Sequence, residues 1–205
     1  MSNKIGIYAG SFDPVHAGHL AFAKSALDDG LDRVMFLVEP RPRRKQGVRA
    51  LEHRIAMVQL AIANEPKFGL IILEQARFTP QDTLPALQAR FKGAELHLML
   101  GDDVLDHLVS FVAGWPNIDY LANNMIFIVA ARNKSVQDIE SSMRTLQKIS
   151  GYKFRYQIIK DELPSISSTL VRPALRRGSR PSGISPKVWN YIQLHQLYSP
   201  AAASK

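Results

Sequence analysis

Two histidines near the start of the chain are the side chains whose types and spacing most clearly suggest chemistry. They lie in the stretch GSFDPVHAGH, residues 10–19, which we call the first motif. His16 and His19 are three residues apart, so they share one face if a helix begins here. Imidazoles donate hydrogen bonds to phosphoryl oxygens and become charged near neutral pH. The pair therefore predicts a phosphate site that stabilises charge during phosphoryl transfer.

The first motif also lies where α/β proteins bind anions, between the end of a predicted strand and the start of a predicted helix. Gly18 has no side chain and would let a ligand approach the backbone. The dinucleotide fingerprint GxGxxG is absent. A zinc site is disfavoured, because helical zinc histidines are usually four residues apart with a glutamate between them. We therefore assign no metal ligand.

A second anion site is predicted near the end of the chain, in LPSISSTLVR, residues 163–172, which we call the second motif. Serine or threonine before an apolar run is a helix N-cap signal, so capping is one role of this stretch. Ser168, Thr169 and Arg172 would also converge on the phosphates of a nucleotide, together with the first amides of the helix.

The two motifs together resemble those of the HxGH nucleotidyltransferases. In that family, SFDPxHxGH follows the first strand, and ISxTxxR or ISxSxxR follows the last strand, as they do here. Resemblance to the nicotinate-nucleotide adenylyltransferase branch covers most of the chain, including EHRIAMVQLAI at 52–62 and LGDDVL at 100–105. It implies transfer of AMP from ATP to nicotinate mononucleotide, giving deamido-NAD and pyrophosphate. Mg²⁺ is expected with the ATP, bound mainly through its phosphates.

The resemblance also implies roles for particular residues. His16, His19 and Arg172 are the expected catalytic residues. In the family, the acid that matches Asp103 holds the ribose, whereas Asp102 could equally be a helix N-terminal acid. His107 is expected at the surface. The expected ATP-binding residues are Gly10, Ser11, Phe12, Gly18, Gly101, Asp103, Ser167, Ser168 and Thr169.

The expected acceptor site is less similar to the branch. Its predicted residues are Lys45, Thr83 and Trp115. The branch has Tyr-Thr before Asp-Thr-Leu, where this chain has FTPQDTL at 78–84, and Phe111 stands at the branch's tryptophan position. The basic loop 41–49 either draws in an anionic acceptor or is a solvated loop. Phosphopantetheine adenylyltransferase and cytidylyltransferase, which share the fold, stay open as alternatives.

The order of apolar patterns predicts an α/β fold. Strands are expected at 4–9, 33–38, 68–73, 95–100, 125–130 and 154–159, and helices at 18–27, 51–63, 83–91, 136–149, 168–177 and 186–194. This alternation predicts a Rossmann-like open, mainly parallel sheet with helices on both faces. The ligand site is expected beyond the carboxyl ends of the strands, where their order reverses. We expect one domain, residues 1–198, and a flexible tail, residues 199–205.

Composition narrows the class of protein further. The 205 residues are 46% hydrophobic and 21% charged, which is typical of a globular chain. No apolar run approaches the ~18 residues of a membrane span. With no cysteine and no signal peptide, we expect a cytoplasmic protein. The net charge of +8 favours anionic partners, and a non-catalytic nucleotide- or nucleic-acid-binding relative is the alternative. Nucleic acid is a disfavoured partner, because aromatic residues do not interleave the basic runs.

Overall fold

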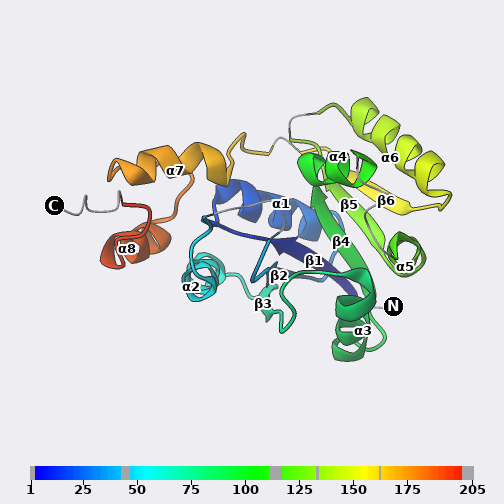
Figure 1. The fold of residues 1–205 in the computed structure, drawn as a ribbon, viewed down its shortest axis with the longest axis horizontal. Coiled ribbons are helices and arrows are strands. Elements are labelled where there is room, and N and C mark those ends of the chain that lie inside the picture. Colours follow the sequence, from blue (N-terminus) through cyan, green and yellow to red (C-terminus); the bar gives the residue numbers. More distant parts are fainter. Residues whose placement is uncertain (1–2, 43–46, 111–116, 133, 162, 200–205) are drawn as a thin grey trace.

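The computed structural model describes residues 3–42, 47–110, 117–132, 134–161 and 163–199. Within them, six strands form one sheet in the order β3-β2-β1-β4-β5-β6, and all five neighbouring pairs are parallel (Figure 1). The strands are β1 (Lys4–Gly10), β2 (Arg33–Val38), β3 (Phe68–Ile72), β4 (Glu95–Gly101), β5 (Ile126–Ala130) and β6 (Arg155–Ile159). The predicted Rossmann-like parallel sheet is confirmed.

At least one helix follows each strand. The helices are α1 (Ala17–Asp28), α2 (Leu51–Ile62), α3 (Pro80–Arg90), α4 (Asp102–Ser110), α5 (Ile118–Asn124), α6 (Val136–Ser150), α7 (Ser168–Arg176) and α8 (Pro186–Leu194). Helix α3 begins three residues before the predicted residue 83, because Pro80 occupies the first turn, where its missing N–H is not needed. Helices α4 and α5, which both lie between β4 and β5, are absent from the expected set. They have nine and seven residues, too few to show a clear helical apolar period.

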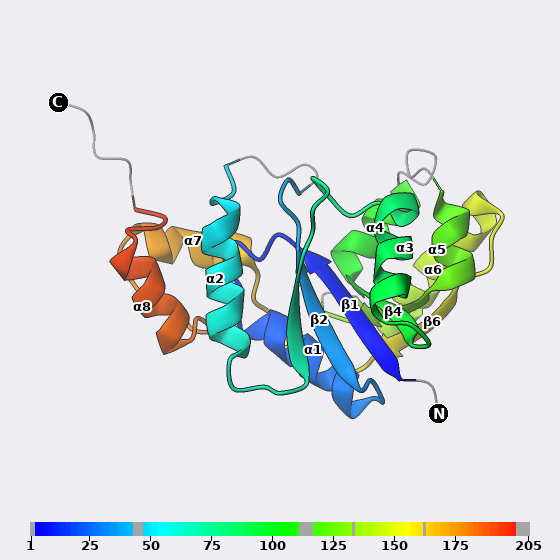
Figure 2. The ribbon, with the colours of Figure 1, turned by 90° about the horizontal axis from the view of Figure 1, so that it is seen from below.

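The sheet separates two apolar cores, one on each face. Phe22 of α1 and Met57 of α2 pack on one face with the strand residues Tyr8 and Phe36. The other core joins strand residues to the buried sides of α3, α4, α5 and α6; its members include Ile7, Leu37, Leu84, Leu105, Leu121 and Met143. Figure 2 shows α2 and α8 side by side at one end of the molecule and α3, α5 and α6 at the other. The predicted helices on both faces are therefore confirmed.

The strand order reverses between β1 and β4, and this reversal creates the site. The chain leaves β1 toward the helix layer of α1 and leaves β4 toward the opposite layer, which contains α4. The two connections therefore diverge and leave a crevice at the carboxyl ends of these strands. Among the helices described, none combines the length and apolar character that crossing a bilayer requires.

Candidate active site

A cavity of about 520 Å³ opens at the carboxyl ends of β1 and β4. His19 of the first motif and Ser168 of the second motif both line it, together with Asp103 at the start of α4. The walls also include Ser11, Phe12, Glu39, Phe78, Gly101, His107 and Arg132. The two motifs, far apart in sequence, thus border one shared cavity.

The two histidines of the first motif occupy different depths. Their rings are stacked, with centroids 3.7 Å apart and an interplanar angle of 28°. His16 is the N-cap residue of α1 and only 3% exposed, and it lines a smaller apolar cavity under the motif. Its main-chain N–H donates to Nδ1 of His19 at 3.2 Å. Because Nδ1 of His19 accepts, the neutral ring carries its proton on Nε2, which can donate to a phosphoryl oxygen.

Phe12 and two glycines give the first motif its shape. Phe12 has a left-handed backbone (φ 47°), and its buried ring packs edge-on against His19, with centroids 5.0 Å apart. A Cβ at Gly10 would lie 3.1 Å from this ring. A Cβ at Gly18 would lie 2.9 Å from the side chain of Ile166, so Ile166 fills the space that we had expected a ligand to approach. Gly18 instead lets the second motif pack closely against the first.

The serines of the second motif have two distinct roles. Ser167 is the N-cap residue of α7, and its Oγ accepts a hydrogen bond from the N–H of Leu170 at 3.2 Å. Ser168 Oγ instead donates to the main-chain carbonyl of Pro14 at 3.0 Å. Capping and a link between the motifs are therefore both present, on adjacent residues.

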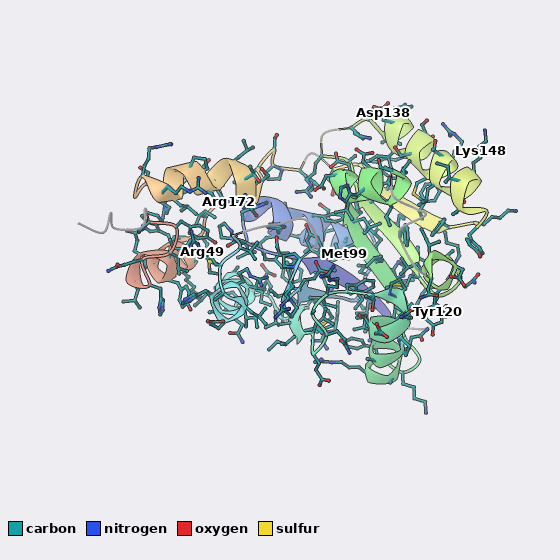
Figure 3. The ribbon with its side chains drawn as sticks, viewed as in Figure 1. Arg49, Met99, Tyr120, Asp138, Lys148 and Arg172 are labelled. Atoms are coloured by element: carbon teal, nitrogen blue, oxygen red, sulfur yellow. The ribbon has the colours of Figure 1, made fainter. Side chains whose placement is uncertain are left out.

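Arg172 makes a second link between the motifs. From α7, its Nη1 donates to the main-chain carbonyl of Asp13 at 3.0 Å, and its Nη2 donates to Thr169 Oγ1 at 3.0 Å. Arg172 is labelled in Figure 3, where α7 lies beside the part of the molecule that contains α1 and β1. The guanidinium therefore brings its positive charge to the turn that carries the histidines.

The opposite side of the cavity carries a pair of opposite charges. Oδ1 of Asp103, whose side chain is 74% exposed, lies 3.8 Å from Nη2 of Arg132, just after β5. A Cβ at Gly101 would collide both with the Asp103 carboxylate and, at 2.5 Å, with the same guanidinium nitrogen, so Gly101 makes room for this pair. Asp102 is buried, and its Oδ1 accepts the N–H of Asp103 at 3.0 Å, as expected of a helix N-terminal acid. Arg132 was not predicted, although a cation directly after a buried strand is a usable signal.

The profile of a known family matches residues 7–174, and its description is "Cytidylyltransferase-like". The chain belongs to the cytidylyltransferase-like family. This membership agrees with the resemblance to nucleotidyltransferases in the two motifs.

Individual proteins that are similar over most of the chain have more specific names than the family. The chain is 34% identical, over 99% of its own length and all of the other, to a protein of Gloeobacter violaceus named probable nicotinate-nucleotide adenylyltransferase. A protein of Carboxydothermus hydrogenoformans with the same name is 32% identical over 95% of this chain and 98% of its own. Among solved structures, Plasmodium falciparum nicotinic acid mononucleotide adenylyltransferase complexed with NaAD has a similar fold (TM-score 0.72; 21% identity; 96% of this chain and 97% of that one).

The expected acceptor residues of this cytidylyltransferase-like chain are only partly seen at the cavity. Thr83 is buried, and its Oγ1 accepts the N–H of Thr79 at 3.1 Å, which joins the N-cap residue of α3 to the helix. It does not line the cavity, whereas Phe78 does. Glu39, which we did not predict, lines the same wall and accepts the N–H of Phe78 at 3.0 Å. Residues that lie outside the described part of the chain are Lys45, Phe111, Trp115 and the tail positions 200–205.

Two further side chains at the cavity were not predicted there. Tyr8 lies on the floor, and burial raises its pKa to about 12, so the phenol keeps its proton near neutral pH. His107 is exposed, as expected, but also lies on the cavity wall. Neither belongs to one of the two motifs, and neither has a sequence pattern around it that predicts a place at the cavity.

No three His, Cys, Asp or Glu side chains of the described residues are grouped closely enough to hold a metal ion. Magnesium is commonly held by one or two carboxylates, substrate phosphates and water. Asp103 and Glu39 are the carboxylates that line the cavity. Mg²⁺ that enters with a triphosphate would thus be coordinated chiefly by the phosphates, and this metal stays a prediction.

Proposed function

We propose that this protein transfers AMP from ATP to nicotinate mononucleotide, producing deamido-NAD and pyrophosphate. The observation that carries the proposal is the direct connection between the motifs beside one cavity. Ser168 and Arg172 donate to the main chain of the turn that leads to His16 and His19. The names of the relatives support nicotinate mononucleotide as the acceptor.

The reaction needs little covalent chemistry from the protein. A phosphate oxygen of the acceptor attacks the α-phosphorus of ATP and forms a new P–O bond. The bond from that phosphorus to the bridging oxygen of the β-phosphate breaks in line, and its electrons leave with pyrophosphate. Catalysis then consists of positioning the two substrates and stabilising the charge that develops on the phosphoryl oxygens.

The site supplies donors on both sides of such a reaction centre. We assign the donor to the α-phosphoryl oxygens to His19 Nε2–H, since Nδ1 is already engaged by the main chain. Thr169 and Arg172 are assigned to the leaving pyrophosphate, at the N-terminus of α7, where the helix dipole favours anions. The Ser168 hydroxyl already donates to the Pro14 carbonyl, so we assign only the main-chain N–H of Ser168 to this anion.

The side of the cavity that carries Asp103 and Arg132 suits the ribose of ATP and the anionic acceptor. Asp103 is assigned to the ribose of ATP, because its exposed carboxylate can accept hydrogen bonds from hydroxyls. Arg132 would attract the anionic acceptor, which carries a carboxylate and a phosphate. The cavity volume of about 520 Å³ falls within the range of about 300–1,000 Å³ of small-molecule sites.

The test is pyrophosphate release from ATP with a panel of acceptors: nicotinate mononucleotide, nicotinamide mononucleotide and phosphopantetheine. We expect the largest kcat/KM with nicotinate mononucleotide, and deamido-NAD as the product. Replacing ATP by CTP tests cytidylyl transfer in the same assay. Preference for phosphopantetheine or CTP would contradict the proposed acceptor or donor, and no release with any pair would contradict the enzyme assignment. The single domain and the cytoplasmic location stay predictions.

A further inference from the structure

A buried arginine outside both motifs holds the first motif from one side. Arg54 of α2 is 1% exposed, and its Nη1 donates to the carbonyls of Ser11 at 2.9 Å and Glu39 at 2.7 Å. Its Nη2 donates to the carbonyl of Pro40 at 2.8 Å, and its Nε donates to that of Arg49 at 2.8 Å. One guanidinium thus cross-links the loop after β1 to the loop after β2.

A buried tyrosine near the end of the chain holds the same motif from the other side. Tyr198 is 1% exposed, and its hydroxyl donates to Oδ1 of the buried Asp13 at 2.5 Å. The main-chain carbonyl of Asp13 also accepts from Arg172. The guanidinium of Arg49 lies 4.9 Å from the centroid of the Tyr198 ring.

The backbone at both ends of this contact is strained. Tyr198 has φ 66°, and Phe12, next to Asp13, has φ 47°. Bulky L-residues rarely adopt this left-handed region, and they stay there only when surrounding contacts determine the conformation. The hydrogen bond between Tyr198 and Asp13 is one such contact, and it joins positions 185 residues apart.

We propose that Tyr198 is a positioning residue for nucleotide transfer. Its hydroxyl fixes Asp13, and Asp13 in turn sets where Arg172 and the two histidines stand relative to each other. Tyr198 does not line the cavity, so it acts through Asp13 and not on the nucleotide. The inference rests on the proposed function, because the alignment matters for adenylyl transfer.

A positioning role affects the reaction differently from a purely structural one. Binding of ATP tolerates small shifts of charged groups, whereas the transition state requires alignment, and a misplacement of about 1 Å can cost about 100-fold in rate. Loss of an interaction made only in the transition state lowers kcat and kcat/KM equally. Loss of folding stability alone lowers the melting temperature and leaves kcat per folded molecule unchanged.

The main variant is Tyr198→Phe, which keeps the ring and removes the hydroxyl. We expect kcat to fall about 10- to 100-fold, as for a lost hydrogen bond to a charged group, with KM for ATP within about twofold. The matched control is Tyr191→Phe in α8, whose hydroxyl bonds to His53 Nδ1 at 3.0 Å. It removes one hydroxyl from the same C-terminal part of the chain, and we expect its kcat to stay within about twofold of wild type.

Several outcomes would overturn the proposal. A folded Tyr198→Phe protein with wild-type kcat would do so, as would an equal loss of kcat in Tyr191→Phe or an effect confined to KM. A wild-type protein that transfers no nucleotide would overturn the proposed function and this role with it. An active wild type with an equally active Tyr198→Phe variant would overturn the positioning role alone.

A second pair of variants keeps the test decisive if Tyr198→Phe fails to fold. Asp13→Asn retains a side-chain oxygen that can accept the Tyr198 hydroxyl, whereas Asp13→Ala has none. We expect the kcat of Asp13→Asn to be at least about tenfold higher than the kcat of Asp13→Ala. Equal losses in the two variants would contradict a role for this hydrogen bond.

Discussion

At the scale of single residues, the two ring nitrogens of His19 have different roles: Nδ1 accepts from the main chain of His16, and Nε2–H is the proposed donor to ATP. Substitutions that keep only one of these hydrogen bonds test the two roles separately. In His19→Asn the amide oxygen lies near the position of Nδ1 and can still accept from His16. In His19→Gln an amide nitrogen reaches the position of Nε2 and can still donate. If Nε2–H stabilises the transition state, we expect the Asn variant to lose at least about 100-fold in kcat. The Gln variant should lose clearly less.

Steady-state pyrophosphate release measures both His19 variants. The control is His195→Ala, which removes an exposed histidine at the C-terminal end of α8. Its turnover should match that of the wild type. Near-normal turnover of His19→Asn would remove His19 from the mechanism.

A buried histidine in the central sheet predicts how stability depends on pH. His97 of β4 is buried, with Nε2 2.9 Å from Oε1 of Glu95. Burial lowers the pKa of His97 from 6.5, although Glu95 opposes the shift. Because the unfolded chain takes up this proton first, the free energy of unfolding falls as pH drops below about 6.5. His97→Gln cannot take up the proton, so its stability should fall less between pH 7.5 and 5.5.

Urea unfolding followed by circular dichroism at several pH values gives the comparison. Between pH 7.5 and 5.5 the free energy of unfolding should fall by more in the wild type than in His97→Gln, whatever their difference at pH 7.5. Parallel pH profiles would show that His97 does not contribute to the acid sensitivity.

At the scale of elements, α6 depends on a capping box at its start. Ser135 Oγ accepts the N–H of Asp138 at 3.2 Å, and the Asp138 carboxylate accepts the N–H of Ser135 at 3.2 Å. Ser135→Ala should lower the free energy of unfolding by about 1 kcal/mol, the usual effect of a lost N-cap. In a chain of this length, that is a fall of about 2–4 °C in melting temperature.

The control for the capping prediction is Ser141→Ala, an exposed serine inside the same helix. Alanine is the better helix former there, so the melting temperature should stay the same or rise slightly. If both variants melt alike, the capping box does not stabilise α6.

At the scale of the whole molecule, the net charge of +8 invites the alternative of nucleic-acid binding. Arg176, Arg177 and Arg180 are exposed at the end of α7 and just after it. Duplex DNA held through six to ten phosphate contacts would lose about 10³–10⁵ in affinity between about 50 and 200 mM salt. Adenylyl transfer between small substrates should lose less than about tenfold over the same range, because few charges are neutralised.

The test measures pyrophosphate release and the binding of labelled duplex DNA over one salt series. It distinguishes an adenylyltransferase from a nucleic-acid-binding protein. Tight DNA binding with a steep salt dependence and no turnover would favour the binding protein. Weak DNA binding with persistent turnover is the result that we expect.

All six strands, most of the helices and the residue types of the two motifs could be predicted from the sequence. Strand and helix patterns are local, because they depend on which side chains a few neighbouring residues present. The predicted strands therefore agree with the structure to within about one residue at each end. The residues of each motif are contiguous, so their types and spacing could be interpreted before any fold was known.

The residues that reach the site from distant parts of the chain could be identified only in the folded structure. Arg132, Glu39 and Tyr198 come to the first motif or its cavity from other strands or from the end of the chain. Which histidine lies at the cavity and which lies beneath it was likewise decided by packing. The physical reason is that such contacts depend on strand order and on the packing of helices against the sheet. These join residues far apart in the chain, and no local pattern of side chains records them.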